Sequence, residues 1–168
     1  MGEEVKPIGS DTEGFASLNR AMLSLLSSYP GLKEREVVFE TLKDGVSGLA
    51  IGTNSGALII TKRESITGHV WQNCQFPFFV IYRTGADREA EKLRVADFLN
   101  TFGLWLTRQP VVLNGTVYQL SAYPELTGGR KIKDVTIFNS YGVEPTEDGY
   151  QDWYLPVTVN YTNEYDPW

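Results

Sequence analysis

The chain has 168 residues, of which 42% are hydrophobic and 21% charged, a composition typical of a globular protein and not of a disordered one. Its formal charge of −6 argues against general binding of DNA or RNA, because contacts with phosphates require concentrated Lys and Arg. The sequence has no apolar run near the roughly 20 residues that cross a bilayer, and it has no basic region followed by an apolar one at its start. We therefore expect the protein to fold in the cytoplasm and to make no contact with a membrane.

Residues 1–9 mix charge, Gly and Pro without periodicity, which predicts a flexible arm ahead of a single domain over 10–168. Ser10-Asp-Thr-Glu13 has the spacing of a helix capping box. Apolar residues then recur every three or four positions, which predicts a helix over residues 12–28 that ends before Pro30-Gly31. Its apolar face comprises Phe15, Leu18, Met22, Leu25, Leu26 and Tyr29.

Short turn signals separate segments with strand character along the rest of the chain. Such pairs supply the positive backbone angles that tight hairpins require, so the sheet is predicted to be mostly antiparallel. The turn signals are Asp44-Gly45, Asn54-Ser-Gly56, Asn114-Gly115 and Asp148-Gly149. The expected strands are Glu36 to Leu42, Gly48 to Thr53, Ala57 to Ser65, Val70 to Arg83, Val111 to Leu120, Lys131 to Tyr141 and Tyr150 to Glu164.

The most informative segment runs from Phe76 to Thr107, where an apolar strand leads through Arg83-Thr84-Gly85 into an amphipathic helix predicted over residues 87–106. The predicted apolar stripe of this helix is Leu93, Ala96, Phe98, Leu99, Phe102 and Leu106. Together the elements predict an α+β fold, a mostly antiparallel β-sheet with two main α-helices packed against it.

The last expected strand alternates apolar and polar side chains, which predicts one dry face and one wetter face. Pro156 lies within it and lacks a backbone N–H, so an edge position or a bulge is expected for this strand.

No catalytic set, cofactor site or metal site is predicted. His69 is the only histidine and Cys74 the only cysteine, so no intramolecular disulfide or zinc set can form from them. Along one strand, the odd separation of these two residues would send their side chains to opposite faces, which argues against a Cys-His enzyme.

Two charged groups remain to be interpreted. Glu144, Glu147 and Asp148, followed by Asp152, read as a solvated hairpin loop. The basic group Arg130, Lys131 and Lys133 can meet phosphate or acidic protein, although three charges at a strand entrance are more often solvated. Paired carboxylates for glycoside hydrolysis are not excluded by spacing, but no pair stands out.

Aromatic residues make up 12% of the chain, and those outside the predicted core are candidates for a protein interface. The candidate interface residues are Trp71, Tyr150, Trp153, Tyr165 and Trp168. A chain with this surplus and no catalytic set is better explained as an assembly component than as an enzyme.

Four strings carry a resemblance to a known family: Phe76-Pro-Phe-Phe-Val-Ile-Tyr-Arg83, Asp97-Phe-Leu-Asn-Thr-Phe-Gly-Leu-Trp-Leu106, Tyr123-Pro-Glu-Leu-Thr-Gly-Gly-Arg130 and Gly149-Tyr-Gln-Asp-Trp-Tyr-Leu-Pro156. Over roughly residues 10–164 the chain resembles the minor capsid or tail terminator proteins of long-tailed phages and prophages of Gram-positive bacteria. None of the strings is a catalytic motif, so the resemblance rests on their order and on overall size.

The resemblance implies a structural protein of the virion, assembled in the cytoplasm of the bacterial host. Such proteins form a hexameric ring on the head-proximal end of the tail tube, stop tube growth, and give the surface for head-tail joining. The implied partners are copies of the chain itself, the tail tube protein and the head connector, with DNA passing nearby but not specifically bound. On this reading the acidic loop of Glu144, Glu147 and Asp148 faces the lumen, where negative charge discourages DNA from sticking.

Three alternatives stay open at this point. Another neck or head-closure component has similar size and ring symmetry. A monomeric small-ligand or peptide-binding α+β module predicts a concave pocket. An enzyme with dispersed carboxylates predicts strongly perturbed acids gathered in one cleft.

Overall fold

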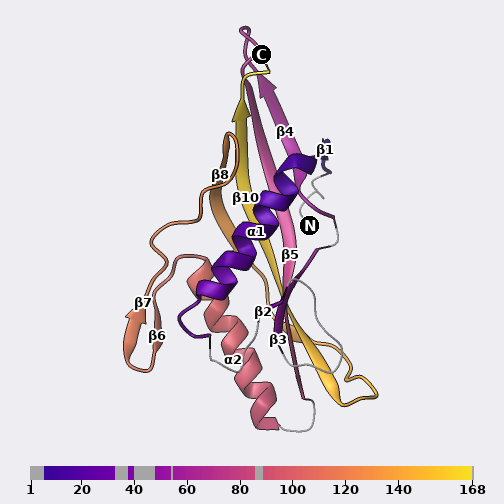
Figure 1. Ribbon diagram of the computed structural model, residues 1–168, viewed down its shortest axis with the longest axis vertical. Coiled ribbons are helices and arrows are strands. Elements are labelled where there is room, and N and C mark those ends of the chain that lie inside the picture. Colours follow the sequence, from indigo (N-terminus) through magenta and orange to yellow (C-terminus); the bar gives the residue numbers. More distant parts are fainter. Residues whose placement is uncertain (1–5, 33–37, 40–47, 54, 86–88, 168) are drawn as a thin grey trace.

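The computed structural model describes residues 6–32, 38–39, 48–53, 55–85 and 89–167. Its centre is a ribbon of two antiparallel strands, β5 (Val70–Gly85) and β10 (Tyr150–Tyr165), paired along their whole length. Strands of 16 residues at about 3.3 Å per residue make this ribbon about 50 Å long. Figure 1 shows it as the long axis of the molecule, and we name its ends, as drawn there, the upper end (β4–β5 turn) and the lower end (start of β10).

Shorter strands complete the sheet on both sides of the ribbon. They are β1 (Gly9–Ser10), β2 (Val38–Phe39), β3 (Gly48–Gly52), β4 (Leu58–Glu64), β8 (Arg130–Ile137) and β9 (Tyr141–Gly142). Strands β3 and β4 pair with β5, while β8 and β9 pair with β10. Among the strands that the structure describes, every pairing is antiparallel except that of β2 with β3, which confirms the prediction of a mostly antiparallel sheet.

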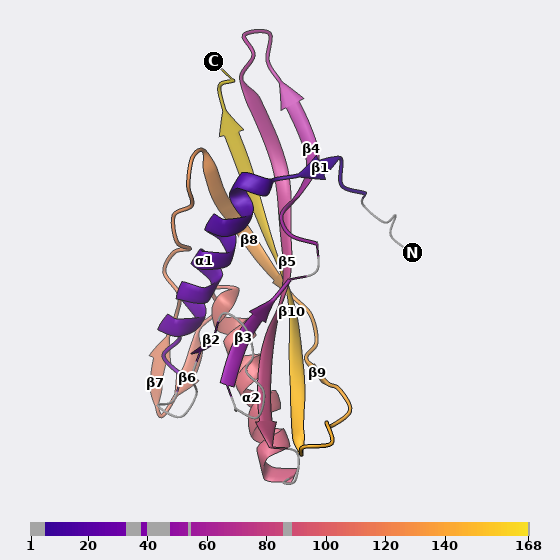
Figure 2. The same cartoon turned by 45° about the vertical axis from the view of Figure 1, so that its right-hand side comes forward.

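Two helices, α1 (Thr12–Ser28) and α2 (Glu89–Leu106), pack on one face of the sheet, as Figures 1 and 2 both show. The α+β prediction is therefore confirmed, and so are the bounds of the first helix. The expected capping box is wrong by one position. Ser10 belongs to β1, where it pairs with Leu58 of β4, so the N-cap of the helix is Asp11. The carboxylate of Asp11 accepts a hydrogen bond from the backbone N–H of Gly14 at 3.1 Å.

The core lies between the helices and one face of the ribbon. Along β5 and β10 every second side chain is buried, with the partly buried Trp153 as the exception, as the alternation predicts. The buried apolar residues of the two strands are Val70, Cys74, Phe76, Phe78, Val80, Tyr82, Leu155, Val157, Val159 and Tyr161. Tyr29 at the end of α1 joins the two helices, because its ring lies 5.6 Å from that of Phe98 and 5.2 Å from that of Phe102.

The buried stripe of α2 differs from the predicted one. Leu93 is 73% exposed, whereas Val95, which was not in the predicted stripe, is completely buried. Val95, Leu99, Phe102 and Leu106 recur at intervals of four, three and four, and Leu93 lies on the opposite side of that helical face. The prediction therefore placed the start of the buried stripe at Leu93, because that residue is apolar, whereas the stripe begins at Val95.

The edge position expected for the last strand is wrong, since β10 lies between β5 and β8. Its pairing with β8 does contain a register shift of the kind a bulge makes, but at Asn160/Tyr161 and not at Pro156. A residue in an antiparallel strand directs its N–H and C=O to the same neighbour. The carbonyl of Pro156 accepts from the N–H of Phe138, so the missing donor faces the side where β8 has ended at Ile137 and β9 begins only at Tyr141. The sheet tolerates this proline because the ladder is interrupted at that point.

The strand expected over Val111 to Leu120 is instead a hairpin, with β6 (Val111–Leu113) and β7 (Thr116–Tyr118) joined by Asn114-Gly115. Positive φ angles of 51° at Asn114 and 80° at Gly115 confirm the turn signal. The strand expected over Lys131 to Tyr141 is likewise divided into β8 and β9.

Several predictions fall partly or wholly outside the described residues. The Asp44-Gly45 turn, Asn54 and Trp168 lie outside them, as does most of the strand expected over Glu36 to Leu42. The predicted arm extends too far into the fold: Gly9 belongs to β1, and the N–H of Ile8 donates to the carbonyl of Ile59 at 2.8 Å.

Candidate protein interaction surfaces

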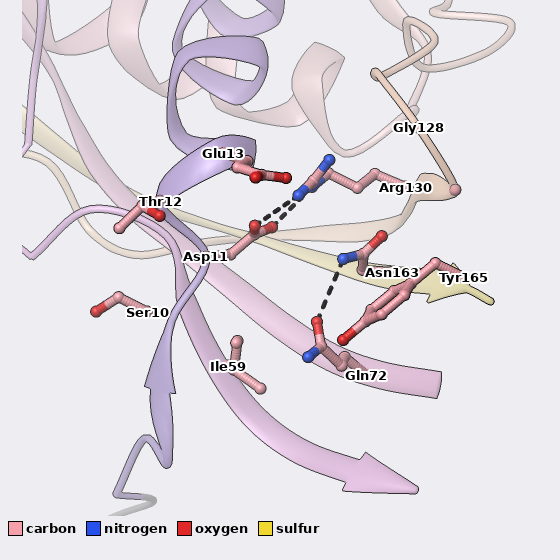
Figure 3. Close-up of a pocket in the computed structure, with 11 residues that line it drawn as sticks. Ser10, Asp11, Thr12, Glu13, Ile59, Gln72, Gly128, Arg130, Asn163 and Tyr165 are labelled. Carbon is pink, nitrogen blue, oxygen red and sulfur yellow. Dashed lines mark hydrogen bonds and ion pairs between the residues drawn. The ribbon is translucent and has the colours of Figure 1, made fainter. Parts of the chain in front are cut away.

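A cleft of about 480 Å³ opens beside the N-terminus of α1, above the helix-covered face of the ribbon (Figure 3). An ion pair between Asp11 and Arg130 forms its back wall. Gln72 of β5 and Asn163 of β10 form its floor, each only 7% exposed, with the Asn163 amide donating to the Gln72 oxygen at 3.3 Å. The cleft is thus built from elements that are distant in the sequence.

The Asp11–Arg130 pair is bidentate and buried. Nε of Arg130 donates to Oδ2 of Asp11 at 2.8 Å and Nη2 donates to Oδ1 at 2.6 Å, with side-chain exposures of 9% for Arg130 and 6% for Asp11. The hydroxyl of Tyr161 donates to the same carboxylate at 2.7 Å. These contacts fix the start of α1 to β8 and β10.

The ionised form of Asp11 is favoured in this setting. Burial alone would raise the pKa of its carboxyl, but hydrogen bonds from Arg130 and Tyr161 and the charge of Arg130 outweigh burial and lower it. Burial, followed by the hydrogen bond to Asp11, raises the pKa of the Tyr161 hydroxyl. Because protein donors occupy both oxygens of Asp11, the group acts as a structural clasp between the helix and the sheet.

His69 and Cys74, the two residues weighed for nucleophilic chemistry, lie in different environments. Cys74 is buried on the helix-covered face, where burial raises the pKa of its thiol to about 11. His69 lies at the upper end of the ribbon between two carboxylates, with Nε2 at 2.7 Å from Glu164 and Nδ1 at 2.6 Å from Asp166. The ring nitrogens are thus engaged with the end of β10 and the residue after it.

We expect the imidazole of His69 to titrate above its ordinary pKa of 6.5, because Asp166 and Glu164 both favour the protonated ring. As the only histidine, it gives a single imidazole signal by NMR. The double variant Glu164→Gln/Asp166→Asn should bring the pKa back toward 6.5. Because the pKa of His69 is higher in the folded state than in the unfolded state, its contacts stabilise the fold fully at pH values below the unfolded-state pKa. This stabilisation is lost as the pH rises through the folded-state pKa. A wild-type pKa at or below 6.5 would contradict this geometry.

The aromatic residues predicted as an interface do not form one surface. Trp71 and Tyr165 lie at the upper end of the ribbon, and Tyr150 and Trp153 at its lower end. Trp71 packs on its own neighbours, with the Arg63 guanidinium 4.9 Å from its ring and the His69 ring at 4.5 Å. Trp153 belongs to the partly buried residues around the core. These residues remain candidate contacts, but in two separate groups.

The acidic residues Glu144, Glu147 and Asp148 are all exposed in the connection between β9 and β10, as the loop interpretation expects. Of the basic group, Arg130 is committed to Asp11, whereas Lys131 and Lys133 are exposed on β8. That the acidic loop faces a lumen stays a prediction.

Sequence reasoning missed an apolar surface on the β6–β7 hairpin. Val112 and Val117 are cross-strand partners, 66% and 64% exposed. Tyr118, the partner of Val111, lies on the other face of the hairpin and is 37% exposed. Figure 1 shows the hairpin projecting from the side of the molecule. The signal was present as Asn114-Gly115 between two short β-branched segments, but reading the segment as one strand hid it.

A second partly apolar surface is the face of the ribbon away from the helices. Phe79 and Tyr154 lie there with rings 5.7 Å apart, and Tyr141 stacks on Tyr154 at 5.6 Å. In Figure 2 both helices lie on the other side of the sheet. The alternation of side chains in β10 predicted a wetter face here. It did not reveal that aromatic side chains from three strands gather on this face.

A scan against models of protein families finds no match, and no curated protein matches the chain. Among the residues that the structure describes, no helix is both long and apolar enough to span a membrane. In the same ranges, no three His, Cys, Asp or Glu side chains come together in a way that could hold a metal ion.

Proposed function

We propose that this chain is a structural protein of a phage or prophage virion, a tail terminator that forms a ring on the head-proximal end of the tail tube. In this role it stops tube polymerisation and provides the surface to which the head connector binds. The support from sequence is the order of the four strings that resemble this family. Two of them form the centre of β5 and the end of α2, which pack in the core as a scaffold would.

The structural observation that carries the proposal is the β6–β7 hairpin. A two-stranded hairpin is only marginally stable in water unless it packs on something. Val111 on one face is buried, but the Val112–Val117 pair on the other face is exposed. An exposed apolar pair on a projecting hairpin is a candidate contact with another protein. A subunit of a ring needs such contacts on its flanks.

Two alternatives are distinguished by different observations. An exposed hairpin is equally compatible with another neck or head-closure component. Only the identity of the protein that the chain binds distinguishes that role from the role of a terminator. The cleft beside Asp11 favours a monomeric small-ligand or peptide-binding module, since its floor carries two buried carboxamides. That module predicts a monomer by light scattering at every protein concentration.

The proposal is tested by adding gold-labelled protein to tubes assembled from the tail tube protein of the same phage. We expect gold at one end of each tube, and the double variant Val112→Asp/Val117→Asp should label ends about 100-fold more weakly. The reason is that two valines lose an apolar contact of about 1.5 kcal/mol each.

Ile66→Asp is the matched control, because Ile66 is fully exposed in the turn at the upper end, away from the hairpin. It should label tube ends like the wild type. Labelling along the tube wall, or none, would argue against the terminator role.

A further inference from the structure

A second cleft, of about 630 Å³, lies on the flank of the molecule between β8 and the segment that follows the β6–β7 hairpin. Its cationic side chains are those of Arg108, Arg130, Lys131 and Lys133. Tyr123 and Leu126 give it an apolar wall. The segment is held in place by Arg108, which donates to the carbonyls of Leu120 at 3.3 Å and Ser121 at 2.7 Å. We call this site the basic cleft.

The positive charge of the basic cleft is only partly compensated by the residues that the structure describes. Lys131 and Lys133 are exposed and have no carboxylate partner among those residues, and Arg108 bonds to neutral carbonyls. Arg130 also lines the cleft, but Asp11 neutralises it. Glu125 is the one carboxylate in the lining, so the cleft keeps an excess of positive charge.

The acidic loop, defined as the residues between β9 and β10, has the opposite charge and a fixed shape. Glu144, Glu147 and Asp148 are exposed on it. Thr146 holds its turn: its N–H donates to the carbonyl of Tyr150 at 2.7 Å, and its hydroxyl bonds to the Asp148 carboxylate. A loop that is already ordered loses little conformational entropy when it docks.

The basic cleft and the acidic loop lie on opposite flanks. In both Figure 1 and Figure 2, the β8 strand and the segment after β7 lie on the left of the molecule, and the loop before β10 lies at the lower right. The loop therefore does not meet the cleft of its own chain. Complementary surfaces on opposite flanks of one chain are what a head-to-tail contact between copies requires.

We propose that the acidic loop of one copy docks in the basic cleft of the next copy. The proposal rests on the proposed ring and names one of its contacts: Glu144, Glu147 and Asp148 face Lys131, Lys133 and Arg108, while Pro145 meets the apolar wall at Tyr123. It places the acidic loop between subunits and not in the lumen. The complementary charge, with three carboxylates opposite a cleft of net positive charge, is what selects a second copy as the occupant.

Charge reversal tests this contact. The loop variant Glu144→Lys/Glu147→Lys/Asp148→Lys and the cleft variant Lys131→Glu/Lys133→Glu should each associate at least tenfold more weakly than wild type in sedimentation velocity at low salt. A 1:1 mixture of the two should associate again, because each reversed loop then meets a reversed cleft. The control is Lys6→Glu/Lys62→Glu, which changes two other exposed lysines and so alters the net charge by the same amount as the cleft variant. This control should associate like the wild type.

Carbodiimide cross-linking gives a second readout, since it joins a lysine amine to a carboxylate that it contacts. In a mixture of ¹⁴N- and ¹⁵N-labelled wild type, we expect links from Lys131 or Lys133 to Glu144 or Glu147 that carry both labels. The proposed contact is overturned if the mixture of the two variants associates no more strongly than either variant alone. It is also overturned if the cross-links join other residues. A wild type that stays monomeric without such links also overturns it. Gold-labelled tube ends would still support the terminator role in each case.

Discussion

Arg130→Met is expected to lower the free energy of unfolding by about 3–5 kcal/mol, because it leaves the Asp11 carboxylate buried without its cation. The loss should appear as a lower midpoint in urea denaturation followed by circular dichroism. Lys131→Met, one residue further along β8 and exposed, is the matched control and should change stability by less than about 0.5 kcal/mol.

The double variant Asp11→Asn/Arg130→Met should recover part of the loss, since it removes both charges together. The pH dependence provides a further check. Because the pKa of Asp11 is lowered in the folded state from its ordinary value of 3.8, the pair stabilises the fold above that value. That stability is lost as the pH falls through the folded pKa, and the Arg130→Met variant should lack it. A cost under 1 kcal/mol would show that the clasp is not needed to hold α1.

Phe76→Ala is expected to destabilise the protein by a similar amount, about 3–5 kcal/mol, because Phe76 is completely buried at the centre of the ribbon. Its ring lies 5.8 Å from that of Phe15 in α1 and 5.5 Å from that of Phe78, so truncation opens a cavity between the helix and the sheet. Thermal unfolding monitored by circular dichroism measures the loss.

Phe79→Ala serves as the comparison, because Phe79 lies on the helix-free face and is only partly buried. It should cost clearly less than Phe76→Ala. Equal losses from the two variants would mean that the helix-free face is as tightly packed as the core, which would contradict the assignment of the two faces.

The elements that local chemistry specifies were predictable from the sequence. The spacing of apolar residues from Leu18 to Tyr29 and the Pro30-Gly31 stop define α1, and Asn114-Gly115 defines a tight turn. Pro156 shows the limit of such reasoning. Its missing donor argued for an edge strand, but the gap between β8 and β9 depends on where two other strands end.

The candidate surfaces were less predictable, because they depend on contacts between distant segments. Asp11 and Arg130 are 119 residues apart, and each alone reads as an ordinary capping or strand-entry residue. The acidic loop and the basic group were both visible in the sequence. Their separation onto opposite flanks was not, since it follows from the path of the chain around the ribbon.

The most direct test of the proposed terminator role is to delete the gene for this chain from the genome that encodes it and to measure tail lengths by electron microscopy. If the protein caps the tube, the lysate should contain tubes of irregular, extended length and heads without tails, and supplying the wild-type chain should restore joined particles. Tails of normal, uniform length attached to heads in its absence would contradict the claim that this chain works by ending the tube and joining it to the head.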